Sequence, residues 1–222
     1  MKKIGILLNV RKNSSRCNNK LLKEFAHNCC LFEIALKKLE KIVANEKYLA
    51  AYEDDFFSFE HNESIKDYRR SEESAHVDGP LSKVFECFNV MESEYVMFFN
   101  PCLAFLKIET IQSAIDFFKN NDYNSLTSVE ILRDWIFNSE GELIYPTNIA
   151  HGDTKKTEKS FRVAHAFHIF SRKDFLKKRG YPWSCNKDDP YLFEISKTEA
   201  IDIDYEEEFL LSSILYEKLF PN

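Results

Sequence analysis

Residues 3–9 read Lys-Ile-Gly-Ile-Leu-Leu-Asn, and Val-Arg-Lys-Asn-Ser-Ser-Arg-Cys-Asn-Asn-Lys follows at 10–20. The first segment is short and mostly apolar, which predicts a buried β-strand. The second is a polar loop whose cations include Arg11, Arg16 and Lys20, and Ser14 supplies a hydroxyl donor. In open α/β sheets, ligands bind at the carboxyl ends of the strands. The loop at 10–20 is therefore a candidate binding site.

A polyphosphate would find both positive charge and hydrogen-bond donors in this loop. The loop contains no glycine, so its backbone cannot wrap an anion in the manner of a glycine-rich phosphate-binding loop. The alternative interpretation is a basic loop that is simply solvated.

Apolar periodicity in the next part of the chain alternates between helix and strand patterns. Helices are predicted at 31–42, at 81–88 with Pro80 at its start, and at 108–118; strands are predicted at 48–52, 94–99 and 123–129. Such alternation favours an α/β fold: a Rossmann-like, three-layer domain with a mostly parallel sheet flanked by helices.

Near the other end of the chain, residues 201–204 read Ile-Asp-Ile-Asp. Side chains alternate between faces along a strand, so Asp202 and Asp204 would project to one side, roughly 7 Å apart at Cα. Two such carboxylates suit a hard divalent cation that also binds substrate phosphates. The alternative is a half-buried strand that runs into an acidic helix start, since acidic residues are common at that position.

Four segments together resemble a known family. Val10, Arg11, Ser14, Arg16 and Lys20 are in register with the pattern Ala-Arg-x-x-Ser-x-Arg-x-x-x-Lys, and Asp202-Ile203-Asp204 with an Asp-Ile-Asp motif. Arg70–Ala75 looks like an Arg-Pro-x-Glu-Leu-Ala segment, and Asn100–Phe105 lies where a Gln-Pro-Thr-Ser-Pro-Leu segment is expected. In this order they resemble the cytidylyltransferases that activate acidic sugars, the CMP-sialic acid and CMP-Kdo synthetases.

The resemblance implies transfer of CMP from CTP to a hydroxyl of an acidic, sialic-acid-like 3-deoxy-2-keto sugar, with release of pyrophosphate, in a pathway of surface-glycan assembly. It assigns Arg11, Ser14, Arg16 and Lys20 to the triphosphate and Arg70 to the neighbourhood of the cytidine. Asn100 is at a position that contacts the sugar. Asp202 and Asp204 would hold magnesium, and with Arg11 and Lys20 they form the implied catalytic set.

The chain departs from the family in three respects, one of which is His165, near where the family usually has an Asn. The chain also has five glycines among 222 residues, and Cys102, Leu103 and Ala104 replace the hydroxyl-bearing part of the family's sugar segment. These changes leave open a catalytically inactive member of the same fold that binds a nucleotide or a partner. The retained pair of carboxylates beside a basic loop favours an active enzyme.

One stretch, about 134–165, interrupts the alternation. Trp135–Phe137, a turn at 138–141 and Glu142–Pro146 predict a hairpin followed by a polar loop. In the resembled family a comparable excursion reaches a second subunit, which implies a homodimer. The alternative is a hairpin that packs on its own domain.

Composition sets the remaining expectations. A chain of 222 residues that is 44% apolar can bury one substantial core, and no linker divides it, so a single domain at 1–222 is expected. The net charge of −6 argues against nucleic acid as a partner. No apolar run reaches the ~18 residues of a membrane span, and no signal peptide is recognisable, which favours a cytoplasmic protein.

Overall fold

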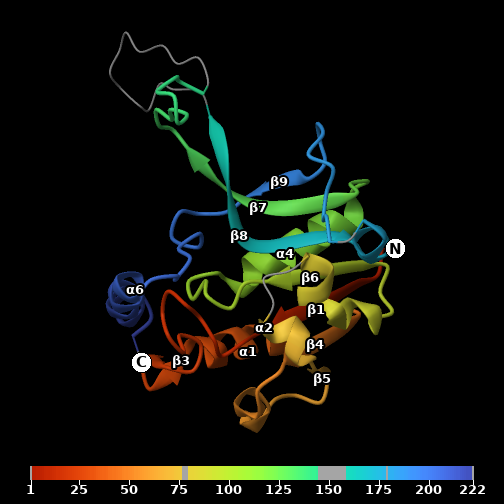
Figure 1. Ribbon diagram of the computed structural model, residues 1–222, viewed down its shortest axis with the longest axis vertical. Helices are drawn as coiled ribbons and strands as arrows, with labels where there is room; N and C mark the ends of the chain where they lie inside the picture. Colours follow the sequence, from red (N-terminus) through yellow and green to blue (C-terminus); the bar gives the residue numbers. More distant parts are fainter. Residues whose placement is uncertain (1, 77–79, 145–158, 179, 222) are drawn as a thin grey trace.

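The computed structural model describes residues 2–76, 80–144, 159–178 and 180–221. The strands of its main sheet are β1 (Ile4–Asn9), β4 (Glu46–Ala51), β5 (Ile65–Arg69), β6 (Tyr95–Phe99), β7 (Ser125–Leu132), β8 (Ser160–Ser171) and β9 (Tyr191–Glu194). Their order is β5-β4-β1-β6-β8-β7-β9 (Figure 1). Within this described sheet β8 is antiparallel to its two neighbours, β6 and β7, and all other pairs are parallel.

Helices cover both faces of the sheet, which confirms the predicted mostly parallel, three-layer α/β fold (Figure 1). They are α1 (Leu31–Lys41), α2 (Glu72–His76), α3 (Leu81–Val84), α4 (Ile108–Asn120), α5 (Arg172–Lys177) and α6 (Glu206–Leu219), with 3-10 turns η1 (Asp54–Ser58) and η2 (Glu86–Asn89). A hairpin of β2 (Glu24–Ala26) and β3 (Cys29–Cys30) forms a second small sheet.

The two faces of the sheet carry separate apolar cores because alternate strand residues point in opposite directions. Ile6, Met97 and Ile169 belong to the larger core, which includes α1 and α4. Leu7 and Phe170 belong to the smaller one, which is rich in phenylalanine and lies under η2 and α5. The alternation within β1 thus anchors the first loop between two cores.

The helix predicted at 81–88 is interrupted, so this prediction is wrong in its length. α3 ends at Val84, Phe85 has φ −103° and ψ 41°, and the 3-10 turn η2 follows. The carbonyl of Val84 accepts hydrogen bonds from Arg70 Nη2 at 3.3 Å and Ser74 Oγ at 3.1 Å. The carbonyl of Val84, which would accept an amide in a continued helix, therefore accepts tertiary hydrogen bonds instead.

The ends of β7 and β8 project from the body of the molecule and carry the predicted hairpin at their tip (Figure 1). Ile144 N donates to the carbonyl of Ile136 at 2.9 Å, and Asn138 N to that of Glu142 at 2.8 Å. The polar loop predicted after the hairpin falls largely on 145–158, outside the described residues. β8 was not predicted; it pairs residues of the 134–165 stretch, from Ser160 onward, with β7.

No helix within the described ranges has the length and apolar character needed to cross a membrane.

Candidate active site

The first loop leaves β1 at the carboxyl edge of the sheet and returns toward the body through a tight turn. Val10 N donates to the carbonyl of Ala50 at 2.9 Å, which extends the pairing with β4 by one residue. Asn19 adopts the left-handed conformation with φ 53°, and its carbonyl accepts from the amides of Leu22 and Lys23. With Cys17 buried, the loop is held at its far end. Its cations are thus held above the edge of the sheet.

The segment that carries the two aspartates is not a strand, so the predicted closing strand is wrong. Residues 201–204 pair with no strand in the described part of the chain and lead directly into α6. Side chains still alternate: Ile203 is fully buried, whereas Asp202 and Asp204 remain partly exposed. Ile201 is only partly buried. One isoleucine, instead of the expected two, therefore anchors the segment.

Tertiary hydrogen bonds hold this segment in place of a neighbouring strand. Ile203 N donates to the carbonyl of Cys102 at 3.3 Å. On the helix side, the carboxylate of Glu208 accepts from the amides of Asp204 at 2.8 Å and Tyr205 at 3.0 Å, which caps the start of α6. Upstream, the buried carboxylate of Glu199 accepts from Lys107 N at the start of α4 at 3.2 Å. The two aspartates thus lie between two helix starts.

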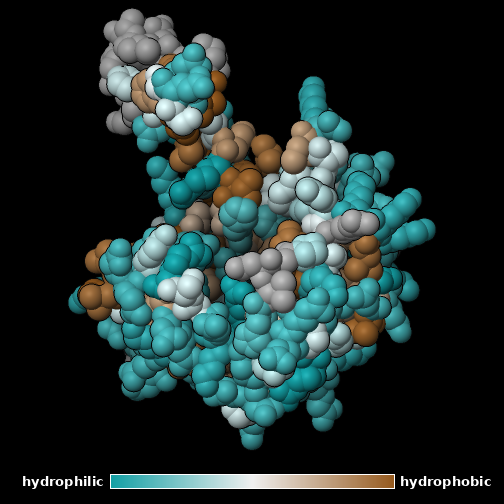
Figure 2. Space-filling view, viewed as in Figure 1, coloured by the Kyte–Doolittle hydropathy of each residue, from teal (hydrophilic) through white to brown (hydrophobic). Residues whose placement is uncertain are grey.

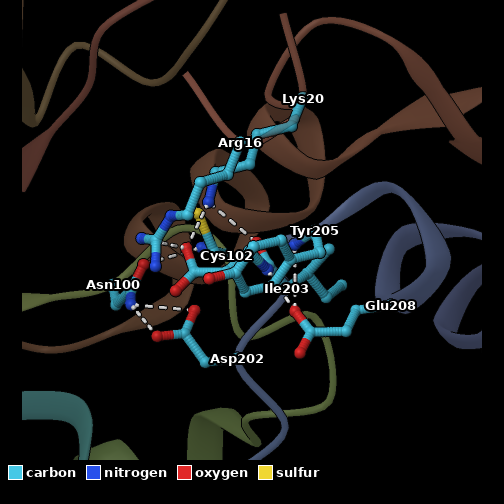
Figure 3. Close-up of polar contacts among 9 residues, drawn as sticks. Arg16, Lys20, Asn100, Cys102, Asp202, Ile203, Tyr205 and Glu208 are labelled. Carbon is cyan, nitrogen blue, oxygen red and sulfur yellow. Dashed lines mark hydrogen bonds and ion pairs between the residues drawn. The ribbon is translucent and has the colours of Figure 1, made fainter. Parts of the chain in front are cut away.

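Two cations of the first loop meet Asp204 directly (Figure 3). Arg16 Nη2 lies 2.8 Å and Lys20 Nζ 2.9 Å from the same oxygen, Asp204 Oδ1. Lys20 Nζ also donates to the carbonyl of Ile203 at 2.8 Å. The guanidinium of Arg16 lies 5.4 Å from the ring centre of Tyr205. The two distant ends of the chain therefore share one site, as the sequence motifs predicted.

The charge on Lys20 is stabilised by this arrangement. Burial alone would lower the pKa of Lys20, but a hydrogen bond with Cys102 and the ion pair with Asp204 outweigh burial and raise it. Burial raises the pKa of the Cys102 thiol to about 11, so the thiol is neutral at pH 7. Asp204 is thus the charged partner of Lys20, whose side chain is only 11% exposed.

Asp202 has a different partner, Asn100, which directly follows β6. Asn100 Nδ2 donates toward both carboxylate oxygens, at 3.3 Å and 3.2 Å (Figure 3). Burial first, and the negative charge of Asp204 second, raise the pKa of Asp202 above its usual range. The two carboxylates are therefore close enough to repel each other, and a cation between them would relieve this repulsion.

The donor set fits magnesium only in part. Asp202 and Asp204 offer oxygen ligands, which this hard cation prefers, and magnesium is commonly held by one or two carboxylates together with substrate phosphates. Among the described residues no group of three or more His, Cys, Asp or Glu side chains is arranged around a common point. A magnesium ion here would therefore take its remaining ligands from a bound nucleotide and from water.

A cleft of about 660 Å³ opens beside the two aspartates, between β8, the 197–205 segment and α6. His165 of β8 lines it together with Lys197. His165 has φ 50°, in the left-handed region, at the bulge where the pairing of β7 and β8 shifts register. Sequence reasoning missed Lys197 and noted His165 only as a departure from the family, without a role, because no local pattern indicates that a bulge places His165 near Asp202.

The other predicted residues do not join this contact network. Arg11 is exposed and has no hydrogen bond or ion pair with any residue in the described ranges; the partly exposed Ser14 likewise has none. Arg70 is 3% exposed, and its guanidinium donates to the carbonyls of Val10, Ser74 and Val84. As placed, Arg70 supports the base of the first loop from inside the protein.

Comparison of the sequence with protein-family models finds no match, and comparison with curated proteins finds none either. Solved structures do match in fold. CMP:2-keto-3-deoxy-manno-octonic acid synthetase in complex with CTP superposes with a TM-score of 0.72 and 10% identity, over 99% of this chain and 100% of that one.

Two further structures belong to related enzymes. The 4-diphosphocytidyl-2C-methyl-D-erythritol synthase from Anaerococcus prevotii has a TM-score of 0.67 and 13% identity, over 97% of this chain and 99% of its own. A cytidylyltransferase from Leptospira borgpetersenii has a TM-score of 0.62 and 13% identity, over 100% of this chain and 89% of its own. The chain therefore has the fold of the cytidylyltransferases, the group that its sequence motifs resemble.

Proposed function

We propose that this chain is a CTP-dependent cytidylyltransferase that transfers CMP to a hydroxyl of an acidic 3-deoxy-2-keto sugar of the sialic-acid type. In this reaction the acceptor oxygen attacks the α-phosphorus, the bond to the β-phosphate oxygen breaks, and pyrophosphate and the hydroxyl proton are released. The observation that carries the proposal is the meeting of Arg16 and Lys20 with Asp204, in a fold shared with a CTP-bound CMP-sugar synthetase.

The chain's own residues perform the positioning that such a transfer needs. Arg16 and Lys20 bind the triphosphate, with Arg11 at the entrance of the loop and Ser14 as a neutral donor. Asp202 and Asp204 would hold magnesium, which supplies positive charge at the α-phosphate. The cleft beside β8 and α6 is lined by Lys197, whose charge would attract the acidic group of an acceptor that enters there.

A pyrophosphate-release assay with CTP and magnesium tests the proposal against a panel of acidic sugars. Release with at least one of the sialic acid, Kdo, legionaminic acid or pseudaminic acid panel is expected. If CTP with magnesium raises the melting temperature but no member of the panel yields pyrophosphate, the inactive binding module becomes the better account. Protection by UTP, ATP or GTP instead of CTP would contradict the choice of base.

The Lys20→Ala substitution is expected to raise the Kd for CTP about 10- to 100-fold. A hydrogen bond to a charged group contributes about 1.5–3 kcal/mol, and about 1.4 kcal/mol changes affinity tenfold. Isothermal titration calorimetry measures the change. Lys12→Ala is the matched control, because Lys12 lies in the same loop but pairs with Asp55 at 2.9 Å, away from Asp204. Equal CTP affinity in the Lys20 variant and the wild type would remove Lys20 from the nucleotide site.

We also propose a homodimer in which the projecting hairpin of one chain covers the cleft of the other. Two apolar surfaces support this. Trp135, Phe137 and Ile144 are exposed on the hairpin, where Figure 2 shows brown side chains on the projecting arm. Leu211 and Leu215 of α6 are exposed and line the cleft. Exposed apolar patches of this kind mark interaction sites.

The dimer predicts a mass of twice the 26.2 kDa of one chain in light scattering after size-exclusion chromatography. Phe137→Glu and Leu211→Glu, at side chains that are 55% and 68% exposed, are each expected to shift the protein to the monomer mass. Val43→Glu places the same charge on an exposed apolar residue outside both surfaces and is expected to leave the dimer intact. A wild-type protein that elutes as a monomer at all concentrations would contradict the proposal.

A further inference from the structure

The side chain of Asn100 has both ends of its amide engaged within the protein. Its Oδ1 accepts from Cys102 N at 2.9 Å, and its Nδ2 points to the two oxygens of Asp202 at 3.2 and 3.3 Å. The backbone is engaged as well, because Asn100 N donates to the carbonyl of Ala166 at 2.9 Å and Asn100 O accepts from Leu103 N at 3.4 Å. One N–H of Nδ2 is thus shared between the two oxygens of Asp202, and Asn100 is not among the described residues that line the cleft.

The Oδ1 contact also determines which way the amide faces. An N–H group can donate only to the oxygen end of the amide, so Cys102 N orients Oδ1 toward itself and Nδ2 toward Asp202. Both contacts favour the same orientation. Asn100 follows β6 directly and is tied to β8 through Ala166, so its position is fixed by the centre of the sheet.

The hydrogen bond from Asn100 matters for Asp202 because Asp202 lacks the charged partners that Asp204 has. Asp204 has Arg16 and Lys20 as charged partners, whereas Asn100 is the hydrogen-bond donor that faces the carboxylate of Asp202. Since burial and Asp204 disfavour the charged form of Asp202, a donor directed at both oxygens stabilises the carboxylate and limits its rotation.

We infer that Asn100 is a positioning residue that holds the Asp202 carboxylate in place for a divalent cation, and that it does not contact the sugar. The inference rests on the proposed function only in placing a cation between Asp202 and Asp204. Outer contacts that orient metal ligands typically change metal affinity 10- to 100-fold when they are removed. The inferred role replaces the sugar contact that the sequence resemblance implied for Asn100.

The test uses Mn²⁺ as the probe, followed by electron paramagnetic resonance, with and without a CTP analogue in which a methylene group bridges the α- and β-phosphates. The Mn²⁺ site of interest is the component that Asp202→Asn removes. Asn100→Ala is expected to weaken this component 10- to 100-fold. The affinity for the CTP analogue in EDTA is expected to stay within about twofold of the wild-type value, since phosphate binding uses the first loop.

A second variant distinguishes loss of the Nδ2 donor to Asp202 from loss of the Oδ1 acceptor for Cys102 N. Asn100→Ser keeps a short side-chain oxygen near Cys102 N but cannot reach Asp202, so it is expected to lose Mn²⁺ affinity as Asn100→Ala does. Asn45→Ala removes a similar amide contact, to Ile4 N at 2.9 Å, at the opposite end of β1. This control is expected to retain wild-type Mn²⁺ affinity.

Three results would overturn the inference. They are unchanged Mn²⁺ affinity in both Asn100 variants, a parallel loss of nucleotide affinity in EDTA, and a wild-type protein that has no Mn²⁺ component dependent on Asp202. In an active protein, a raised KM for the acceptor sugar with unchanged Mn²⁺ affinity would restore the sugar contact. Because the Mn²⁺ readout does not require turnover, a chain that transfers no CMP still decides the role of Asn100.

Discussion

Replacement of Asp204 by asparagine is expected to slow pyrophosphate release from CTP by about 10³-fold or more. Asparagine keeps the shape of the side chain but removes one of the two charges that would hold magnesium, and it removes the ion pairs with Arg16 and Lys20. A metal ion contributes several kcal/mol of charge stabilisation in such a transfer. Each change of about 1.4 kcal/mol alters the rate tenfold. The measurement is kcat at saturating CTP and magnesium.

The melting temperature should change by only a few degrees. Lys20 keeps its hydrogen bond to the carbonyl of Ile203 at 2.8 Å, and Arg16 is largely exposed, where ion pairs contribute at most about 1 kcal/mol. Glu206→Gln is the matched control: it removes one carboxylate charge two residues away, where Glu206 pairs with Lys23 at 2.7 Å. Full activity of Asp204→Asn would refute the metal assignment.

Replacement of Arg70 by methionine is expected to destabilise the fold by about 3 kcal/mol. The guanidinium is buried and supplies donors to the carbonyls of Val10 and Val84 at 2.9 and 3.3 Å and to Ser74 Oγ at 3.0 Å. Methionine fills part of the volume but removes all of these donors. The carbonyl of Val84 keeps its hydrogen bond from Ser74 Oγ, whereas a buried acceptor that loses its partner, such as the carbonyl of Val10, costs about 1–3 kcal/mol. For a chain of this length the melting temperature should fall by about 10 °C.

Arg69→Met is the matched control, one residue away. Arg69 is exposed and pairs with Asp54, and exposed ion pairs contribute about 0–1 kcal/mol. Differential scanning calorimetry in the absence of nucleotide compares the two variants. A direct contact between Arg70 and cytidine predicts a different pattern: a higher Kd for CTP with a nearly unchanged melting temperature. The experiment therefore also decides how Arg70 acts.

Much of the fold was predictable because the strands beside β1 carry strong local patterns. β1, β4 and β6 are short apolar runs that end in polar segments, and α1 and α4 show clear helical periodicity. These elements are in the predicted places, with boundaries shifted by a few residues. The order of elements and their regular spacing were sufficient to predict a parallel α/β sheet.

β8 was missed because a bulge interrupts its pattern. A strand shows apolar side chains at every second position, but an extra residue moves all later side chains to the other face. In β8 the pairing with β7 shifts between Val163 and His168, and the alternation around the exposed His165 gives way to an unbroken buried run at 166–170. The periodic signal of a 12-residue strand is thereby split into two short pieces.

The two aspartates of the site were predictable from the sequence, but the residues that hold them and the first loop in place were less so. Alternation of Ile203 with two aspartates correctly indicated a buried anchor between partly exposed acids, but alternation alone does not show whether a partner strand exists. The side chains of Asn100 and Arg70 donate to acceptors far away in the sequence, on Asp202 and Val10. Such contacts arise from tertiary structure, and no local spacing predicts them.

The shared oxygen of Asp204 has a thermodynamic consequence. Arg16 and Lys20 both contact Asp204 Oδ1, so a metal ion that bound Asp204 would compete with them and release them. The released cations can then bind phosphate oxygens. Under the proposed function, metal and nucleotide therefore increase each other's affinity, and linkage requires that the factor be the same in both directions. The ion pairs of Asp204 would thus make the binding of metal and nucleotide cooperative.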